Sequence, residues 1–135
     1  MYQVTKKIAF CYAHRLLDYE GPCANLHGHN GQVELILEET DLDRRGMVYE
    51  FGELKARMAG WIDEHLDHKT LLRSDDVLVE TLKETGQAVY VMKQNPTAEA
   101  MAEMIYREGR KLGLPIVEVR LWETPNSSAS YRKES

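Results

Sequence analysis

Three of the five histidines of this 135-residue chain, His14, His27 and His29, fall within sixteen residues. In an extended segment, alternate residues project from the same face, so His27 and His29 can aim at one point while Gly28 leaves space behind them. His14 ends the preceding apolar segment and can supply a third nitrogen. Three neutral imidazoles around zinc leave an open fourth position, as in catalytic sites. The pattern therefore favours a catalytic zinc site over three unrelated polar histidines.

Cys23 precedes His27 by four residues, in a loop that must pass over this metal site. A thiol beside a divalent cation and a histidine loses its proton near neutral pH and can act as a base or nucleophile. Two alternatives stay open: Cys23 is a fourth zinc ligand that closes a structural site, or it is a small buried hydrophobic residue. Cys11, inside a predicted strand, is expected to be a packing residue.

Two further candidate sites lie at the ends of predicted elements. Asp67 and His68 form a candidate proton-transfer pair if the first long helix ends there, because adjacent residues on a helix do not face each other. The alternative for His68 is an interaction with the helix dipole, and His65 is expected to be a solvated helix residue.

Glu123, at a strand end, can accept two parallel hydrogen bonds from a planar N–C–N donor edge. The alternative for Glu123 is that it is an exposed charge at the end of a strand, without a binding role.

The elements that must position these residues are α+β, with an antiparallel sheet. Alternation and β-branched residues predict four strands, at residues 2–14, 32–38, 116–123 and 129–132. Apolar spacing predicts a helix over residues 51–65, and Asn95-Pro96-Thr97 begins a second long helix that stops at Gly113. Residues 69–93 hold a short helix around 77–83 and an apolar run at 88–92, but their pattern does not place them in the sheet.

Composition and charge exclude several classes of protein. Seventeen Lys and Arg against twenty-two Asp and Glu give a net charge of −5, without the basic stripe of a nucleic-acid binder. No apolar run approaches the roughly 20 residues of a membrane span, and the first residues lack the apolar segment of a signal peptide. We therefore expect a single domain over residues 1–135, cytoplasmic, without a nucleic-acid or membrane partner.

Six blocks of the sequence resemble, in order, the signature blocks of the 6-pyruvoyl-tetrahydropterin synthase and 6-carboxytetrahydropterin synthase family. The blocks are residues 10–16, 23–29, 47–55, 66–69, 95–99 and 122–124. Because they span nearly the whole chain, the resemblance is specific. It implies a tunnelling fold, a four-stranded antiparallel sheet with two helices on one face in the order ββααββ. Such sheets join into a barrel in a homo-oligomer, a trimer or a hexamer, with active sites at subunit interfaces.

The resemblance also implies roles for the residues singled out above. It implies that His14, His27 and His29 bind zinc, with one ion per subunit. It also implies that Cys23, Asp67 and His68 are catalytic, and that Glu123 anchors the pterin ring. The implied substrate is 7,8-dihydroneopterin triphosphate. Three residues separate Cys23 from His27. This spacing resembles that of the 6-carboxytetrahydropterin branch of the family, which serves queuosine precursor synthesis.

The sequence departs from the family pattern in three places. Glu50 stands where an aspartate is usual, Cys11 replaces a small or acidic residue, and residues 69–93 form a longer segment than expected. Alternatives to the carboxy synthase are the 6-pyruvoyl synthase reaction on the same substrate and a non-catalytic zinc module in which Cys23 closes the metal site. A metal-dependent hydrolase would also suit three histidines, but no other residue supports it.

Overall fold

The computed structural model describes residues 1–134, which form six strands and three α-helices. The strands are β1 (Tyr2–His14), β2 (His27–Glu39), β3 (Lys69–Arg73), β4 (Val89–Met92), β5 (Ile116–Thr124) and β6 (Ser127–Arg132). The helices are α1 (Phe51–His65), α2 (Leu78–Glu84) and α3 (Ala98–Lys111), and a short 3-10 turn, η1 (Pro22–Ala24), lies between β1 and β2.

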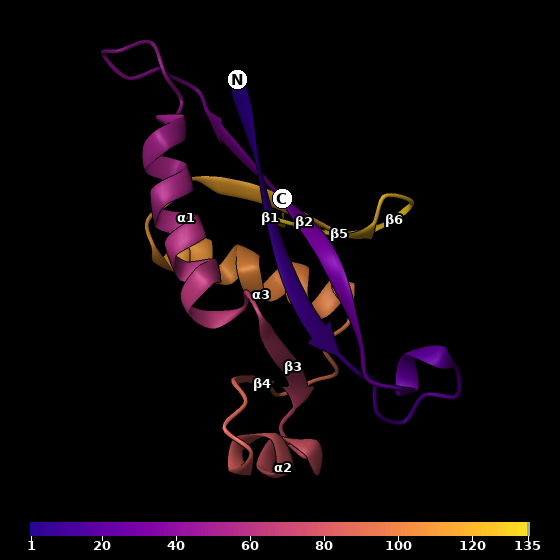
Figure 1. Cartoon of the computed structure of the whole chain (residues 1–135). Helices are drawn as coiled ribbons and strands as arrows, with labels where there is room; N and C mark the ends of the chain where they lie inside the picture. Colours follow the sequence, from indigo (N-terminus) through magenta and orange to yellow (C-terminus); the bar gives the residue numbers. More distant parts are fainter. Residues whose placement is uncertain (135) are drawn as a thin grey trace.

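All six strands belong to one twisted sheet in the order β4-β3-β1-β2-β5-β6 (Figure 1). The four predicted strands are its antiparallel part, β1-β2-β5-β6. The predicted four-stranded sheet and the order ββααββ are nevertheless wrong, because β3 pairs parallel with β1 and β4 pairs parallel with β3. Strands this short carry too few residues for periodicity to identify them. Figure 1 shows α2 beside these two added strands.

The core lies between one face of the sheet and the two long helices. Its buried side chains include Phe10, Val33 and Leu35 from the sheet, Leu54, Met58 and Ile62 from α1, and Met101 and Ile105 from α3. Register decides which residues share this face: His14 pairs with His27, and Tyr12 pairs with His29. Since Tyr12 and His14 are buried with the core, the pairing places all three candidate zinc ligands on the core face, at one end of the sheet.

Both long helices begin at residues whose side chains cap them. The Glu50 carboxylate accepts hydrogen bonds from the backbone N–H groups of Gly52 (2.8 Å) and Glu53 (2.7 Å). Thr97 accepts one from Ala100 N–H (3.1 Å). These contacts satisfy N–H groups that the first helical turn leaves free. The helix predicted over residues 51–65 is confirmed, and glutamate in place of the usual aspartate keeps a working cap.

Other boundaries differ modestly from expectation. β2 starts at His27, with the His27-Gly28-His29 segment opening the strand ahead of the alternating residues 32–38, and it pairs with β1 along its whole length. The short helix expected around residues 77–83 is present as α2, and the apolar run at 88–92 is strand β4. Within residues 1–134, the helices are all too short or too polar to cross a bilayer.

Candidate metal centre and active site

The sheet brings His14, His27 and His29 together at the junction of β1 and β2. Their ligand nitrogens all lie within 4.8 Å of one another. His14 is buried, with 2% of its surface exposed, and the other two are half-buried. A Cβ added to Gly28 would lie 3.1 Å from the backbone oxygen of Tyr12, so glycine allows the strands to approach closely here. The three histidines therefore form a compact cluster that can hold one cation.

Backbone carbonyls set the orientation of two of these rings. His14 Nδ1 lies 2.7 Å from the oxygen of Pro96, and His27 Nδ1 lies 2.7 Å from the oxygen of Asn25. A carbonyl only accepts hydrogen bonds, so each Nδ1 carries a proton, and in the neutral form of each ring the lone pair is on Nε2. Such contacts are typical of histidines that bind metal. Both rings are thus oriented so that Nε2 can bind a metal ion.

The buried Nε2 nitrogen of His14 is suited to bind a metal ion. Its Nε2 has no hydrogen-bond partner among residues 1–134. Burial lowers the pKa of His14 to about 4, against a smaller opposing effect of the Pro96 hydrogen bond. The imidazole is therefore neutral at pH 7, as metal coordination requires. A buried, neutral and unpartnered nitrogen beside two other imidazoles fits a divalent cation such as zinc.

Cys23 lies in η1, on the loop that joins β1 to β2, and is half-buried. Its backbone oxygen accepts a hydrogen bond from Leu16 N–H (2.9 Å). The Asn95 amide fixes the same loop, because it accepts from Leu17 N–H (2.9 Å) and donates to Leu17 O (2.8 Å). Among the described residues, the metal-binding cluster consists of the three histidines without Cys23. This arrangement leaves a coordination position for another ligand.

Asp67 and His68 form the expected pair, because α1 ends at His65. The Asp67 Oδ2 and His68 Nδ1 atoms lie 2.7 Å apart, and Asp67 Oδ1 accepts from Cys11 N–H (2.9 Å). His68 takes a positive φ of 60°, and its own N–H donates to Cys11 O (2.7 Å). Burial alone would raise the pKa of the Asp67 carboxyl, but the hydrogen bonds from Cys11 and His68 outweigh burial and lower it.

His68 lines a pocket together with Cys11 and Asn30, which lie on the face of the sheet away from the helices. His68 and His29 line the same pocket of about 410 Å³, together with Cys11 and Lys69. Within the described residues, the pair makes no hydrogen bond or ion pair with the Cys23 thiol.

Two expectations about neighbouring residues are wrong. His65 is half-buried rather than solvated, because its ring stacks on Trp61 at 4.7 Å between centroids and its Nδ1 lies 2.9 Å from Trp61 O. Cys11 is not a core residue: its thiol donates to Asn30 Oδ1 (3.0 Å), on the face of the sheet away from the helices. Its position in the strand, next to buried Phe10 and Tyr12, already places it on the other face.

Glu123 faces the histidine cluster. Its Oε2 lies 3.4 Å from His14 Nε2 and 3.3 Å from His29 Nε2, and about a quarter of its side chain is exposed, 26%. The pairing of Gln32 with Trp122 directs the next residue of β5 to the face that carries the histidines. The carboxylate is therefore part of the site and not a strand-end charge in solvent.

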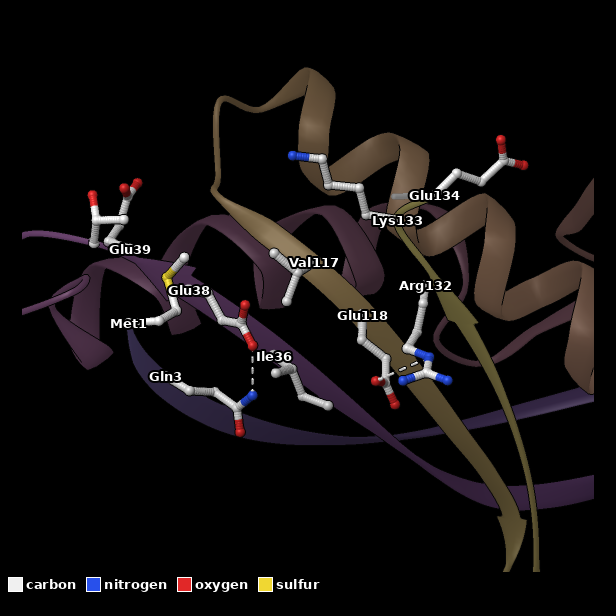
Figure 2. Close-up of a pocket in the computed structure, with 11 residues that line it drawn as sticks. Met1, Gln3, Ile36, Glu38, Glu39, Val117, Glu118, Arg132, Lys133 and Glu134 are labelled. Atoms are coloured by element: carbon white, nitrogen blue, oxygen red, sulfur yellow. Dashed lines mark hydrogen bonds and ion pairs between the residues drawn. The ribbon is translucent and has the colours of Figure 1, made fainter.

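Another pocket, of about 600 Å³, lies at the opposite end of the same strands (Figure 2). There Gln3 donates to Glu38 (2.8 Å), and Arg132 lies 3.8 Å from Glu118. The residues that line this pocket in the described chain include no histidine or cysteine. This end of the sheet therefore lacks the chemistry of the histidine cluster.

The sequence model of the family described as 6-pyruvoyl tetrahydropterin synthase matches residues 3–134. The chain belongs to the 6-pyruvoyl tetrahydropterin synthase family. A 6-carboxy-5,6,7,8-tetrahydropterin synthase of Rickettsia conorii is 36% identical, over 93% of this chain and 96% of the relative. One from Aquifex aeolicus is 34% identical, over 83% of this chain and 76% of the relative.

Solved structures of similar proteins show that the architecture is that of the 6-pyruvoyl tetrahydropterin synthase family. An uncharacterised protein from Wolinella succinogenes superposes with a TM-score of 0.82 at 29% identity, covering 98% of both chains. The 6-pyruvoyl tetrahydropterin synthase of Caenorhabditis elegans gives 0.73 at 24% identity, covering 98% of this chain and 96% of that one. At this lower identity the likeness concerns the fold.

The sequence missed the groups that orient the site. The carbonyls of Pro96 and Asn25 hold two imidazoles, and the Asn95 side chain holds the loop of Cys23. Backbone carbonyls have no signature of their own in a sequence. The Asn95-Pro96-Thr97 block is the one part of the sequence that marks this region. Its pattern indicates a helix start and does not indicate that Asn95 and Pro96 also hold the site.

Proposed function

We propose that this chain is a zinc-dependent 6-carboxytetrahydropterin synthase. It converts 7,8-dihydroneopterin triphosphate and one water molecule into 6-carboxy-5,6,7,8-tetrahydropterin, with release of acetaldehyde and triphosphate. The observation that carries this proposal is the cluster of three imidazoles, two of them with Nε2 prepared by backbone hydrogen bonds, in a chain of the 6-pyruvoyl tetrahydropterin synthase family. The curated relatives named as carboxy synthases support this product.

His14, His27 and His29 are the proposed zinc ligands. A bound zinc ion supplies a Lewis acid that acidifies the side-chain hydroxyls of the substrate. The neutral histidines leave the full charge of the ion available for this effect, whereas thiolate ligands would reduce it. The absence of Cys23 from the metal-binding cluster of the described residues argues against a closed structural site.

Cys23 and the Asp67–His68 pair are the proposed proton-transfer groups. The Cys23 thiolate removes a proton from the substrate side chain, and His68 exchanges protons on the opposite face. Asp67 holds His68 Nδ1 at 2.7 Å, which leaves Nε2 of this exposed ring for the transfer. The two electrons released from the side chain enter the pterin ring, so the reaction needs no external redox cofactor. Glu123 binds the N–C–N donor edge of the ring.

Product analysis tests the proposed function. The purified chain, loaded with one zinc per subunit, is incubated with 7,8-dihydroneopterin triphosphate, and the products are identified by mass spectrometry. We expect 6-carboxytetrahydropterin and one acetaldehyde for each pterin, and we expect the chelator-treated protein to regain turnover when zinc is restored. A 6-pyruvoyl product would assign the chain to the other branch of the family. Absence of any turnover would favour the zinc-module alternative.

A further inference from the structure

The Tyr12 hydroxyl is a buried polar group without a partner. Tyr12 is 3% exposed, and among the described residues its hydroxyl has no hydrogen-bond partner. A buried hydroxyl without a hydrogen bond costs free energy of folding, and native proteins pair most such groups. A phenylalanine would fill the same space without this cost, so packing of the ring does not explain the hydroxyl.

The Tyr12 ring is fixed beside the histidine cluster. It stacks on Phe10 with 5.2 Å between ring centroids, and its centroid lies 5.2 Å from that of His14 and 5.6 Å from that of His29. The hydroxyl lies on the axis of the ring, so a flip of the ring about that axis leaves the hydroxyl in place. These contacts therefore hold the hydroxyl in one position within the site.

Gly31 allows the Tyr12 ring to lean across β2 towards the end of β5. A Cβ added to Gly31 would lie 2.8 Å from Tyr12 Cε1 and 3.5 Å from the backbone oxygen of Trp122, so the ring occupies the space that a side chain would take. Glu123 directly follows Trp122, and its carboxylate faces the histidine cluster. Burial raises the pKa of Tyr12, and the charge of Glu123 raises it further, in agreement with a hydroxyl on the side of Glu123.

This position is close to the open side of the site. The side chains of Glu123 and His29 are 26% and 18% exposed, whereas Tyr12 lies below the surface. A ligand that turns the Glu123 carboxylate outwards therefore reaches the hydroxyl.

We propose that Tyr12 is a substrate-binding residue whose hydroxyl donates a hydrogen bond to an oxygen of the bound pterin; this inference rests on the proposed function. A carboxylate only accepts hydrogen bonds, whereas a tyrosine hydroxyl donates one, so Tyr12 complements Glu123. The substrate offers two kinds of acceptor oxygen: the ring carbonyl beside the N–C–N donor edge, and the oxygens of the side chain. The hydrogen bond that the hydroxyl lacks in the free protein forms in the complex.

The test compares the wild-type protein with Tyr12→Phe, which removes only the hydroxyl. The zinc-loaded proteins are titrated with 7,8-dihydroneopterin in a calorimeter, and urea denaturation measures stability without ligand. We expect Tyr12→Phe to keep its zinc and to bind the pterin about tenfold more weakly. It should unfold at the same or a higher urea concentration, because an unpaired buried hydroxyl has been removed. Tyr106→Phe, at a buried tyrosine that packs on Tyr131, is the matched control and should keep the wild-type affinity.

Titration with 7,8-dihydropterin, which has the ring but not the hydroxylated side chain, identifies the acceptor. Weaker binding of both compounds by Tyr12→Phe assigns the hydrogen bond to the ring carbonyl, and weaker binding of 7,8-dihydroneopterin alone assigns it to the side chain. Unchanged affinity for 7,8-dihydroneopterin would overturn the inference and leave the proposed function intact. A Tyr12→Phe protein that unfolds at clearly lower urea concentration would also overturn it, because the hydroxyl would then serve the fold. Failure of the wild-type protein to bind either compound would overturn both proposals.

Discussion

At the scale of single residues, the histidine cluster depends as much on backbone carbonyls as on the imidazoles. Pro96 O and Asn25 O each hold an Nδ1 at 2.7 Å, and this choice of protonated nitrogen directs two lone pairs to one point. The histidines themselves could be predicted from their spacing on paired strands. The carbonyls could not, because any residue has one and only the fold brings Pro96 beside β1.

Removal of any one imidazole should release the metal. We expect His14→Ala, His27→Ala and His29→Ala each to contain much less than one zinc per chain by elemental analysis, because two remaining ligands hold zinc poorly. His65→Ala is the matched control, since His65 stacks on Trp61 outside the cluster, and it should keep its zinc. Full zinc content in all three cluster variants would refute the ligand assignment.

At the scale of elements, a buried ion pair joins the end of β1 to the start of α2. Asp76 is 4% exposed. It accepts from Arg15 Nε (2.8 Å) and from Leu78 N–H (2.8 Å). Arg15 directly follows His14, a proposed metal ligand, so this pair ties the added part of the sheet to the histidine cluster. Sequence patterns identified α2 but not its attachment, because the two partners lie 61 residues apart.

Asp76→Ala should destabilise the protein markedly. Loss of the carboxylate leaves Arg15 without its partner and the Leu78 N–H without an acceptor, so we expect a loss of about 2–4 kcal/mol in the free energy of unfolding. Urea denaturation followed by circular dichroism measures the change. Asp75→Ala, at an exposed neighbour, is the control and should change stability little. A similar effect in both variants would contradict a special role for Asp76.

The same pair makes part of the stability depend on pH. The hydrogen bond from Arg15 lowers the pKa of the Asp76 carboxyl in the folded protein. Its contribution is therefore complete above the ordinary carboxyl pKa of about 4 and is lost as the pH falls through the lower folded pKa. We expect the stability difference between wild type and Asp76→Ala to be constant from about pH 5 to 7 and to narrow below about pH 4. A difference that stays constant in acid would exclude this linkage.

At the scale of the whole molecule, the sheet described over residues 1–134 has two open edges, at β4 and at β6. Within this part of the chain, β4 and β6 each pair on one side only, and Val91 on β4 is 40% exposed. Open edges and their apolar side chains are commonly covered by association. The family resemblance predicts closure into a barrel, and the antiparallel part of the sheet could be foreseen from alternation. β3 and β4 could not, because strands of five and four residues show too little periodicity, and β3 pairs in parallel with β1, which is remote in the sequence.

We therefore expect the protein to be a trimer or a dimer of trimers in solution, since closed assembly pairs the free strand edges. Light scattering at micromolar concentration, coupled to size-exclusion chromatography, measures the mass directly. A species of monomer mass alone would contradict the barrel assembly.

An open metal site with a separate catalytic thiol distinguishes the proposed enzyme from a zinc-binding module, and Cys23→Ala tests this distinction most directly. Zinc content and turnover of dihydroneopterin triphosphate are measured on one preparation, beside Cys11→Ala, which removes the other thiol. We expect Cys23→Ala to keep one zinc and its fold while turnover falls at least about 10²-fold, the usual effect of one general acid–base group. Loss of zinc together with activity would make Cys23 a ligand, and full activity would remove it from the mechanism.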